Sequence, residues 1–190
     1  MHPLAFITSH RNLMTYYLPS DPNVEVSGRL VQAFIDSVDF AREARKSLFQ
    51  AHGTLNVAPE DWYDWTGVLF ALRDIERLIG ERMLFMIGEG VGSAVELPEP
   101  PTTLPEILAA PEQILDAYHR GGSAGSYRVL ELDATHRTAV IALEMPYPTS
   151  GVLGFLSSFF RRYPDLRKLR LELRKETPTK QTLRVFDLHW

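Results

Sequence analysis

The last third of the chain alternates hydrophobic and polar positions with a period of two, which is typical of β-strands. The alternation is clearest where Leu169, Leu171 and Leu173 are separated by charged residues. Between two pairs of such segments, residues 150–162 place hydrophobic side chains at helical spacing. The predicted strands cover residues 127–133, 138–144, 169–174 and 182–190. This order predicts a β-β-α-β-β unit, with one helix packed against a four-stranded antiparallel sheet.

The first part of the chain has the period of amphipathic helices instead. Residues 29–50 place Leu30 and Phe34 on one helical face. We expect Ser27 to cap the start of this helix, because a serine hydroxyl accepts a hydrogen bond from the free backbone N–H groups there. Gly53 stands where a helix stop is expected.

A second helix is predicted to begin at Pro59, whose fixed φ suits the first helical position. Glu60 and Asp61 follow in the first turn, where the helix dipole favours negative charge. A hydrophobic stripe continues to Gly80, which ends or bends the helix. The stripe consists of Trp62, Trp65, Leu69, Leu72, Ile75 and Ile79. Residues 83–87 are hydrophobic on all sides, so we expect them to be buried in the core or against a partner.

A connector with three prolines, over residues 96–103, separates these helices from the next one. Pro111 predicts the start of a third helix over residues 112–119, which Gly121 and Gly122 stop. Its inner face is predicted to consist of Ile114, Leu115 and Tyr118.

The whole pattern predicts an α+β fold, with a helical N-terminal half followed by the β-β-α-β-β unit. We expect one domain over residues 1–190, mainly helical over 1–120 and α/β over 121–190. The long uncharged run over residues 145–160 contains prolines and is shorter than the roughly 20 residues that span a bilayer. We therefore expect no membrane span.

The chain has no cysteine, which excludes disulfides, thiolate metal sites and cysteine nucleophiles. This absence, and a start without the features of a signal peptide, predict a cytoplasmic protein. The net charge is −4, although nine basic residues face four acidic ones from Arg161 onward. Because these charges alternate with leucines, we interpret them as the solvated face of a sheet and expect no nucleic-acid partner.

His119 is a candidate functional residue, because imidazole serves as a metal ligand, a haem ligand or a general base. A histidine in the last turn of a helix also complements the helix dipole without any further role. The aromatic cluster of Trp62, Tyr63 and Trp65 would either line an apolar ligand pocket or pack in the core. Both interpretations stay open for the histidine and for the cluster.

No other motif predicts a catalytic site. Ser150 lacks the Gly-x-Ser-x-Gly context of a hydrolase nucleophile, and we interpret it as a helix cap. The glycines at 88–92 and 121–125 lack the surroundings of nucleotide-binding loops. The first run indicates a helix end or close backbone packing, and the second a flexible connector. No histidine pair has metal-ligand spacing, so we predict no metal site and no enzyme.

Three segments of the second half share a family pattern. They are Leu115 to His119 ahead of a hairpin, Tyr147 to Leu153 entering a helix, and Val185 to Leu188 in the last strand. With them, residues 114–190 resemble the ligand-binding superfamily of haem–nitric-oxide-binding sensors, 4-vinyl-reductase domains and the Bet-type subunits of the vesicle-tethering TRAPP complex. The resemblance implies this fold and a ligand pocket.

In the haem branch of that superfamily, a histidine on the helix before the sheet binds iron, and a Tyr-x-Ser-x-Arg motif holds the haem propionates. His119 stands in the matching place, whereas Tyr147 is followed by Thr149 and Gly151 instead of the serine and the arginine. On this ground we predict that the chain takes no cofactor, with haem as the alternative.

We therefore interpret the chain as a non-catalytic small-molecule-binding or sensory module of bacterial type, which forms a homodimer through its helical half. A small apolar ligand would bind between the helices and the sheet. The candidate ligand-binding residues are Trp62, Trp65, Tyr118, His119 and Tyr147. One alternative is a haem-binding gas sensor with His119 as axial ligand, and another is an adaptor or scaffold subunit that binds only protein.

Overall fold

The computed structural model describes residues 17–37, 50–53, 57–97, 99–177 and 182–190. Its helices are α1 (Gly28–Asp36), α3 (Trp65–Ile79), α4 (Glu81–Ala94), α5 (Leu104–Tyr118) and α6 (Thr149–Arg161). Its strands are β1 (Glu25–Ser27), β2 (Trp62–Asp64), β3 (His119–Arg120), β4 (Ser126–Asp133), β5 (Thr138–Glu144), β6 (Arg170–Thr177) and β7 (Leu183–His189). The predicted helix over residues 29–50 lies partly outside the described residues.

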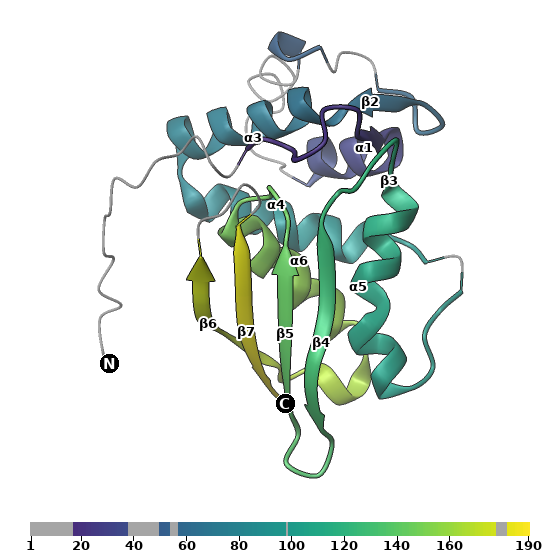
Figure 1. The fold of residues 1–190 in the computed structure, drawn as a ribbon, viewed down its shortest axis with the longest axis vertical. Coiled ribbons are helices and arrows are strands. Elements are labelled where there is room, and N and C mark those ends of the chain that lie inside the picture. Colours follow the sequence, from purple (N-terminus) through teal and green to yellow (C-terminus); the bar gives the residue numbers. More distant parts are fainter. Residues whose placement is uncertain (1–16, 38–49, 54–56, 98, 178–181) are drawn as a thin grey trace.

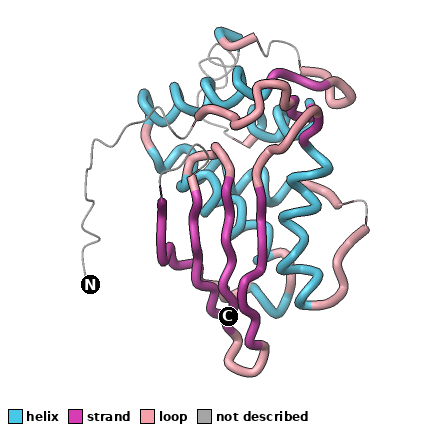
Figure 2. Tube along the Cα trace, viewed as in Figure 1, coloured by secondary structure: helices cyan, strands magenta, loops and turns pink. Residues whose placement is uncertain are grey.

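Strands β4 to β7 form an antiparallel sheet of order β4-β5-β7-β6, which Figure 2 shows side by side. Because β5 and β7 pair directly, Ile141 lies opposite Phe186, and both side chains are fully buried. Helix α6 follows β5 in the chain and, with α4, lies behind this sheet, while α5 lies beside β4 (Figure 1). The predicted α+β class and the β-β-α-β-β unit are confirmed.

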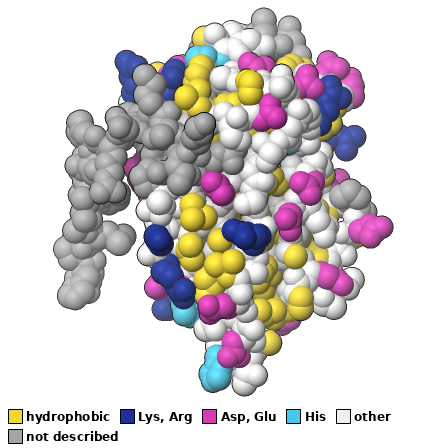
Figure 3. All heavy atoms as spheres, viewed as in Figure 1, with side chains coloured by type: hydrophobic (Ala, Val, Ile, Leu, Met, Phe, Trp, Pro, Cys, Tyr) yellow, Lys and Arg dark blue, Asp and Glu magenta, His cyan; other side chains and the backbone are white. Residues whose placement is uncertain are grey.

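The outward face of this sheet mixes side chains of every kind. Figure 3 shows hydrophobic side chains in its middle, with basic and acidic ones among and around them. Arg174 and Asp187 form an ion pair between adjacent strands β6 and β7. Five of the eight residues of the edge strand β6 are charged, which disfavours pairing with a further strand.

The structure also contains a small sheet of order β2-β1-β3, which the sequence pattern does not predict. Strand β1 pairs antiparallel with both neighbours, so that Val26 lies opposite Tyr63 on one side and His119 on the other. Three segments far apart in the sequence therefore meet, and they place the end of α5 next to the start of α1.

This small sheet explains why the helix predicted from Pro59 is wrong. Residues 62–64 pair with β1 as strand β2, so helix α3 begins only at Trp65. The carboxylate of Asp64 accepts a hydrogen bond from the backbone N–H of Thr66 and caps the helix at its true start. A local signal for a helix start was overridden by pairing with a distant strand.

Three other predicted helix boundaries are confirmed or corrected. Ser27 caps α1 by accepting a hydrogen bond from the backbone N–H of Arg29, as expected. Gly80 separates α3 from α4 with a φ of 105°, a left-handed conformation that glycine adopts without cost. The helix predicted to start at Pro111 is wrong, because α5 begins seven residues earlier and contains this proline.

Helix α5 begins where it does because of a capping box. The hydroxyl of Thr103 accepts from the backbone N–H of Glu106, and the Glu106 carboxylate accepts from the backbone N–H of Thr103. Of the predicted inner face, Ile114 and Leu115 are buried. The helix ends at Tyr118, one residue before His119, and does not include it.

Helices α4 and α6 pack backbone against backbone through glycines on both helices. A Cβ atom on Gly88 would lie 2.0 Å from the carbonyl oxygen of Gly151, and one on Gly154 would lie 2.0 Å from that of Phe85. No side chain has room there. For residues 88–92, the interpretation as close backbone packing is therefore confirmed, and the one as a helix end is wrong.

The predicted burial of residues 83–87 is correct on one side only. Leu84 and Ile87 are buried, whereas Met86 is 43% exposed. Helix α4 is thus amphipathic where it packs on α6. Among the described residues, no helix combines the length and the hydropathy needed to cross a membrane.

Candidate functional site

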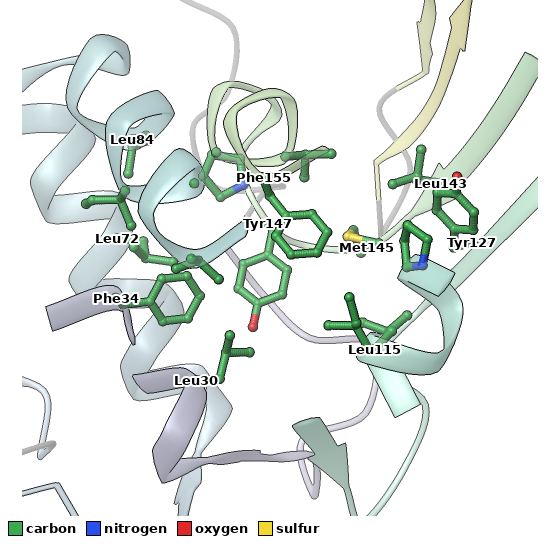
Figure 4. Close-up of a pocket in the computed structure, with 18 of the residues that line it drawn as sticks. Leu30, Phe34, Leu72, Leu84, Leu115, Tyr127, Leu143, Met145, Tyr147 and Phe155 are labelled. Carbon is green, nitrogen blue, oxygen red and sulfur yellow. The ribbon is translucent and has the colours of Figure 1, made fainter. Parts of the chain in front are cut away.

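A cavity of about 90 Å³ lies between the helices and the four-stranded sheet. Figure 4 shows the ring of Tyr147 among the lining side chains, with its hydroxyl group pointing into the space between Leu30 and Leu115. The lining is almost entirely hydrocarbon. It consists of Leu30, Phe34, Leu72, Leu84, Ile87, Gly88, Val91, Pro111, Ile114, Leu115, His119, Tyr127, Leu143, Met145, Tyr147, Pro148, Gly151, Val152 and Phe155.

His119 reaches this cavity from strand β3, directly after helix α5. Its backbone is extended, with φ −132° and ψ 150°, and its side chain is 7% exposed. The interpretation as a residue of the last helical turn is corrected by one position. Its ring nevertheless hydrogen-bonds a free carbonyl group at the end of α5, because Nδ1 lies 2.8 Å from the carbonyl oxygen of Leu115.

The hydrogen-bond partners of His119 fix its tautomer. The carbonyl of Leu115 only accepts, so Nδ1 must carry the proton and donate. Burial lowers the pKa of His119 from 6.5 to about 4, so the ring is neutral at pH 7 and Nε2 has no proton. The site therefore presents a neutral imidazole whose Nε2 lone pair faces the hydroxyl of Tyr147, at the edge of the cavity.

Tyr147 and Trp65 complete a chain of hydrogen bonds to this lone pair. The indole Nε1–H of Trp65 donates to the Tyr147 hydroxyl over 2.9 Å. That hydroxyl lies 2.9 Å from His119 Nε2 and donates to it. Burial raises the pKa of the Tyr147 hydroxyl, so it keeps its proton at neutral pH. The rings also touch edge to face, with 4.8 Å between the centroids of Trp65 and His119.

Of the candidate ligand-binding residues, the structure brings three together and places two elsewhere. Trp65, His119 and Tyr147 form the hydrogen-bonded group. Trp62 lies instead against the guanidinium of Arg120, 4.5 Å from its ring centroid. Tyr118 bonds through its hydroxyl to the backbone of Glu96. Of the five candidates, only His119 and Tyr147 line the cavity, and Trp65 reaches it through its hydrogen bond to Tyr147.

The sequence-based reasoning missed Arg184, which holds the segment around Tyr147 in place. This side chain is fully buried, and its guanidinium donates to the carbonyl oxygens of Tyr147 and Met145 and to the Thr149 hydroxyl. The sequence pattern of β7 did indicate that this arginine is buried. Arg184 stands in the alternation of β7 where Phe186 and Leu188 mark the buried face, and a charged residue there requires buried partners.

Two further expectations concern catalysis and metals. Ser150 does not cap α6, because the helix begins at Thr149 and Pro148 holds the cap position. The Ser150 hydroxyl is buried and has no hydrogen-bond partner among the described residues. Within the same part of the chain, no group of three or more histidine or acidic side chains is arranged to hold a metal ion.

No family model matches the sequence, and no curated protein matches it. Solved structures match it in fold. A Tt H-NOX protein with two substitutions aligns with a TM-score of 0.63 over 86% of this chain and 94% of that chain, at 9% identity. An oxygen-binding H-NOX domain related to soluble guanylate cyclases aligns with a TM-score of 0.59 over 86% of this chain and 94% of that chain, at 10% identity. An iron(II) unliganded H-NOX protein from K. algicida aligns with a TM-score of 0.51 over 86% of this chain and 97% of that chain, at 14% identity.

These matches confirm that the chain shares the fold of the haem–nitric-oxide-binding branch, to which the resemblance pointed. They also correct the prediction that the chain takes no cofactor. The finding against it is that the solved structures with this fold include one described by its haem redox potential and one described by its iron.

Proposed function

We propose that this chain, which has the fold of the H-NOX domains, is a non-catalytic haem-binding module that senses a small gas, with His119 as the axial ligand of the iron. One observation carries the proposal. A buried, neutral imidazole with an unprotonated Nε2 lies at the apolar cavity of this fold.

The donor set fits an iron ligand. Histidines that bind metals usually donate their second ring N–H to a carbonyl or carboxylate, which fixes the tautomer and the ring orientation. His119 donates its Nδ1–H to the carbonyl of Leu115 in this way. Since the ring is neutral, Nε2 offers its lone pair without first losing a proton.

The lining fits a porphyrin in chemistry more than in size. The cavity of about 90 Å³ is smaller than the roughly 300–1,000 Å³ of pockets for drug-sized ligands, so its walls would have to move apart. Hydrocarbon from helices on several sides would then surround the ring and exclude water from the metal. When bound, haem supplies an iron centre that binds a diatomic gas at an open coordination position.

Reconstitution with haemin tests the proposal. The wild-type chain is expected to develop a Soret band, and His119→Ala is expected to lose it, because the imidazole supplies the bond to iron. His136→Ala is the matched control. That histidine lies exposed in the β4–β5 turn, where it pairs with Asp133, so its removal should leave the absorption spectrum unchanged.

Two results would contradict the proposal. One is a wild-type chain that remains colourless with excess haemin although circular dichroism shows it folded. The other is a Soret band of equal intensity and position in His119→Ala, which would place the haem elsewhere.

A second candidate function follows from the cavity as it stands. An apolar cavity of roughly 150 Å³ in another protein stays dry and binds benzene or xenon. The cavity described here has a volume of about 90 Å³, so of these two it suits xenon, the smaller. Xenon-dependent shifts of methyl signals from Leu115 and Val152 would support an apolar-ligand module, and their absence in a folded sample would oppose it.

A further inference from the structure

The nitrogen of His119 that would bind iron is covered by a hydroxyl of the same chain. Tyr147 donates its hydroxyl hydrogen to His119 Nε2 over 2.9 Å and uses the one lone pair that a metal would need. Trp65 donates to the same hydroxyl over 2.9 Å and fixes its direction. The chain thus supplies its own partner for the ligand nitrogen.

We propose that Tyr147 is a gate residue that competes with haem iron for His119, an inference that rests on the function proposed above. In the closed state, the Tyr147 hydroxyl occupies Nε2. In the open state, the phenol ring has turned away and Nε2 is free. Opening therefore breaks the hydrogen bonds that Tyr147 makes with His119 and with Trp65.

The surroundings of Tyr147 make it a side-chain gate. Its backbone carbonyl accepts a hydrogen bond of 2.6 Å from the guanidinium of Arg184, and this arginine is fully buried. Pro146 and Pro148 flank it and restrict the backbone further. The backbone therefore stays in place, and the ring moves by rotation about its own side-chain torsions.

The resemblance to the haem branch implies a different role for the same tyrosine, as a residue that holds the propionates. The two roles predict opposite effects of one substitution. A gate that competes with iron weakens haem binding, so its removal strengthens it. A residue that holds haem strengthens binding, so its removal weakens it.

Tyr147→Phe separates the two roles, because it removes the hydroxyl and keeps the ring. Titration of each apoprotein with haemin measures the affinity. The gate predicts that Tyr147→Phe binds haemin about two- to tenfold more tightly than wild type, which is the factor expected for the net loss of a hydrogen bond in the apoprotein. Tyr63→Phe is the matched control, since its hydroxyl accepts a 2.8 Å hydrogen bond from the backbone of Ala58, outside the cavity. Its affinity should equal that of wild type.

A measurement without haem tests the premise of the gate. Nitrogen-15 spectra of the histidine rings report the state of each nitrogen. Tyr147→Phe should move the His119 Nε2 signal to that of an acceptor without a hydrogen-bond donor. The Nδ1 signal should stay in place, because its bond to Leu115 remains. Tyr63→Phe should leave both signals unchanged.

The outcomes distinguish the gate from the proposed function. Equal or weaker haemin affinity in Tyr147→Phe, in a chain that binds haemin through His119, overturns the gate and leaves the haem proposal standing. An unchanged Nε2 signal also overturns the gate, whether or not haem binds. If neither wild type nor Tyr147→Phe binds haemin, the proposed function falls, and the gate falls with it.

Discussion

Arg184 is fully buried although its guanidinium is charged at any ordinary pH. Each of its nitrogens donates to an oxygen, either between Met145 and Thr149 or at Thr182 just before β7, and Glu176 lies 3.5 Å from Nε. A buried charge persists only with such partners, because the loss of its hydration is otherwise not offset. The residue therefore stabilises the backbone on which Tyr147 stands.

Replacement of Arg184 should therefore be severe. Arg184→Leu leaves the carbonyl oxygens of Met145 and Tyr147 without this donor, and we expect the free energy of unfolding to fall by about 3–5 kcal/mol. Arg174→Leu is the control, because Arg174 makes an ion pair on the outer face of the sheet, where water screens the charges. Urea denaturation measures both. Equal effects of the two substitutions would refute this account of Arg184.

Thr103 and Glu106 carry a second prediction, on the start of α5. Thr103→Ala removes the cap and should lower the free energy of unfolding by about 1 kcal/mol. Hydrogen bonds from the backbone N–H groups of Thr102 and Thr103 lower the pKa of Glu106 below its usual 4.5. Its ionised form is thus favoured in the folded state, and its contribution is present above pH 4.5 and lost as the pH falls below it.

The control for the pH dependence is Glu106→Gln, which cannot ionise. The difference in unfolding free energy between wild type and Glu106→Gln should be constant near neutral pH and shrink as the pH falls through 4.5. A difference that stays constant down to pH 3 would show that the carboxylate has no part in the cap.

At the scale of elements, the contact between α4 and α6 depends on glycines, and one helix offers a matched pair of positions. A Cβ on Gly154 would meet the backbone of Phe85 at 2.0 Å, whereas the nearest atoms to a Cβ on Gly151 lie at 3.5 and 3.7 Å. The first is a clash with backbone that cannot move alone. The second is an ordinary contact.

Alanine should therefore have opposite effects three residues apart. Gly154→Ala should destabilise the fold by about 1–3 kcal/mol through overpacking. Gly151→Ala should be neutral or stabilising by up to about 1 kcal/mol, because alanine favours the helix more than glycine does. Thermal unfolding followed by circular dichroism compares them. A loss of stability at both positions, of similar size, would contradict the packing described here.

At the scale of the whole molecule, local patterns predicted the β-β-α-β-β unit well. Its strands are consecutive hairpin partners or follow one helix, so alternation such as that of Leu169, Leu171 and Leu173 was sufficient. The small sheet was missed because Val26 pairs with residues 37 and 93 positions further along the chain, Tyr63 and His119. Hydrophobic periodicity within one segment cannot predict a pairing between segments so far apart.

Three of the five candidate site residues form the hydrogen-bonded group, but its geometry was not predicted. Trp65, His119 and Tyr147 stand out as aromatic and titratable residues, yet their hydrogen bonds join three elements. Trp62 was included as part of the aromatic cluster with Tyr63 and Trp65, but it lies on strand β2, where its ring packs against Arg120. The cover of His119 Nε2 by Tyr147 depends on the fold as a whole, so spacing alone could not indicate it.

The homodimer stays a prediction. Because Leu84 and Ile87 of α4 are buried within the chain, it now rests on other hydrophobic residues. Leu78 and Ile79, adjacent at the end of α3, are 67% and 49% exposed, and contact with a second copy would remove this hydrophobic surface from water. Light scattering should give about twice the 21.6 kDa of one chain, and Leu78→Glu should shift the mass toward a single copy. Leu130→Glu, on strand β4, is the control. A wild-type mass of one chain at tens of micromolar would end the idea.

The glycine contact between α4 and α6 also makes the cavity mechanically uneven. These two helices touch through their backbones, so the wall that they form, with Leu84 and Val152, is stiff. Helix α5 lines the cavity from another side with Ile114 and Leu115, and it runs directly into β3, where His119 stands. A ligand larger than the cavity would therefore shift α5 more easily than the α4–α6 wall. His119 would move with the end of that helix, so occupation of the cavity would be coupled to the position of the imidazole.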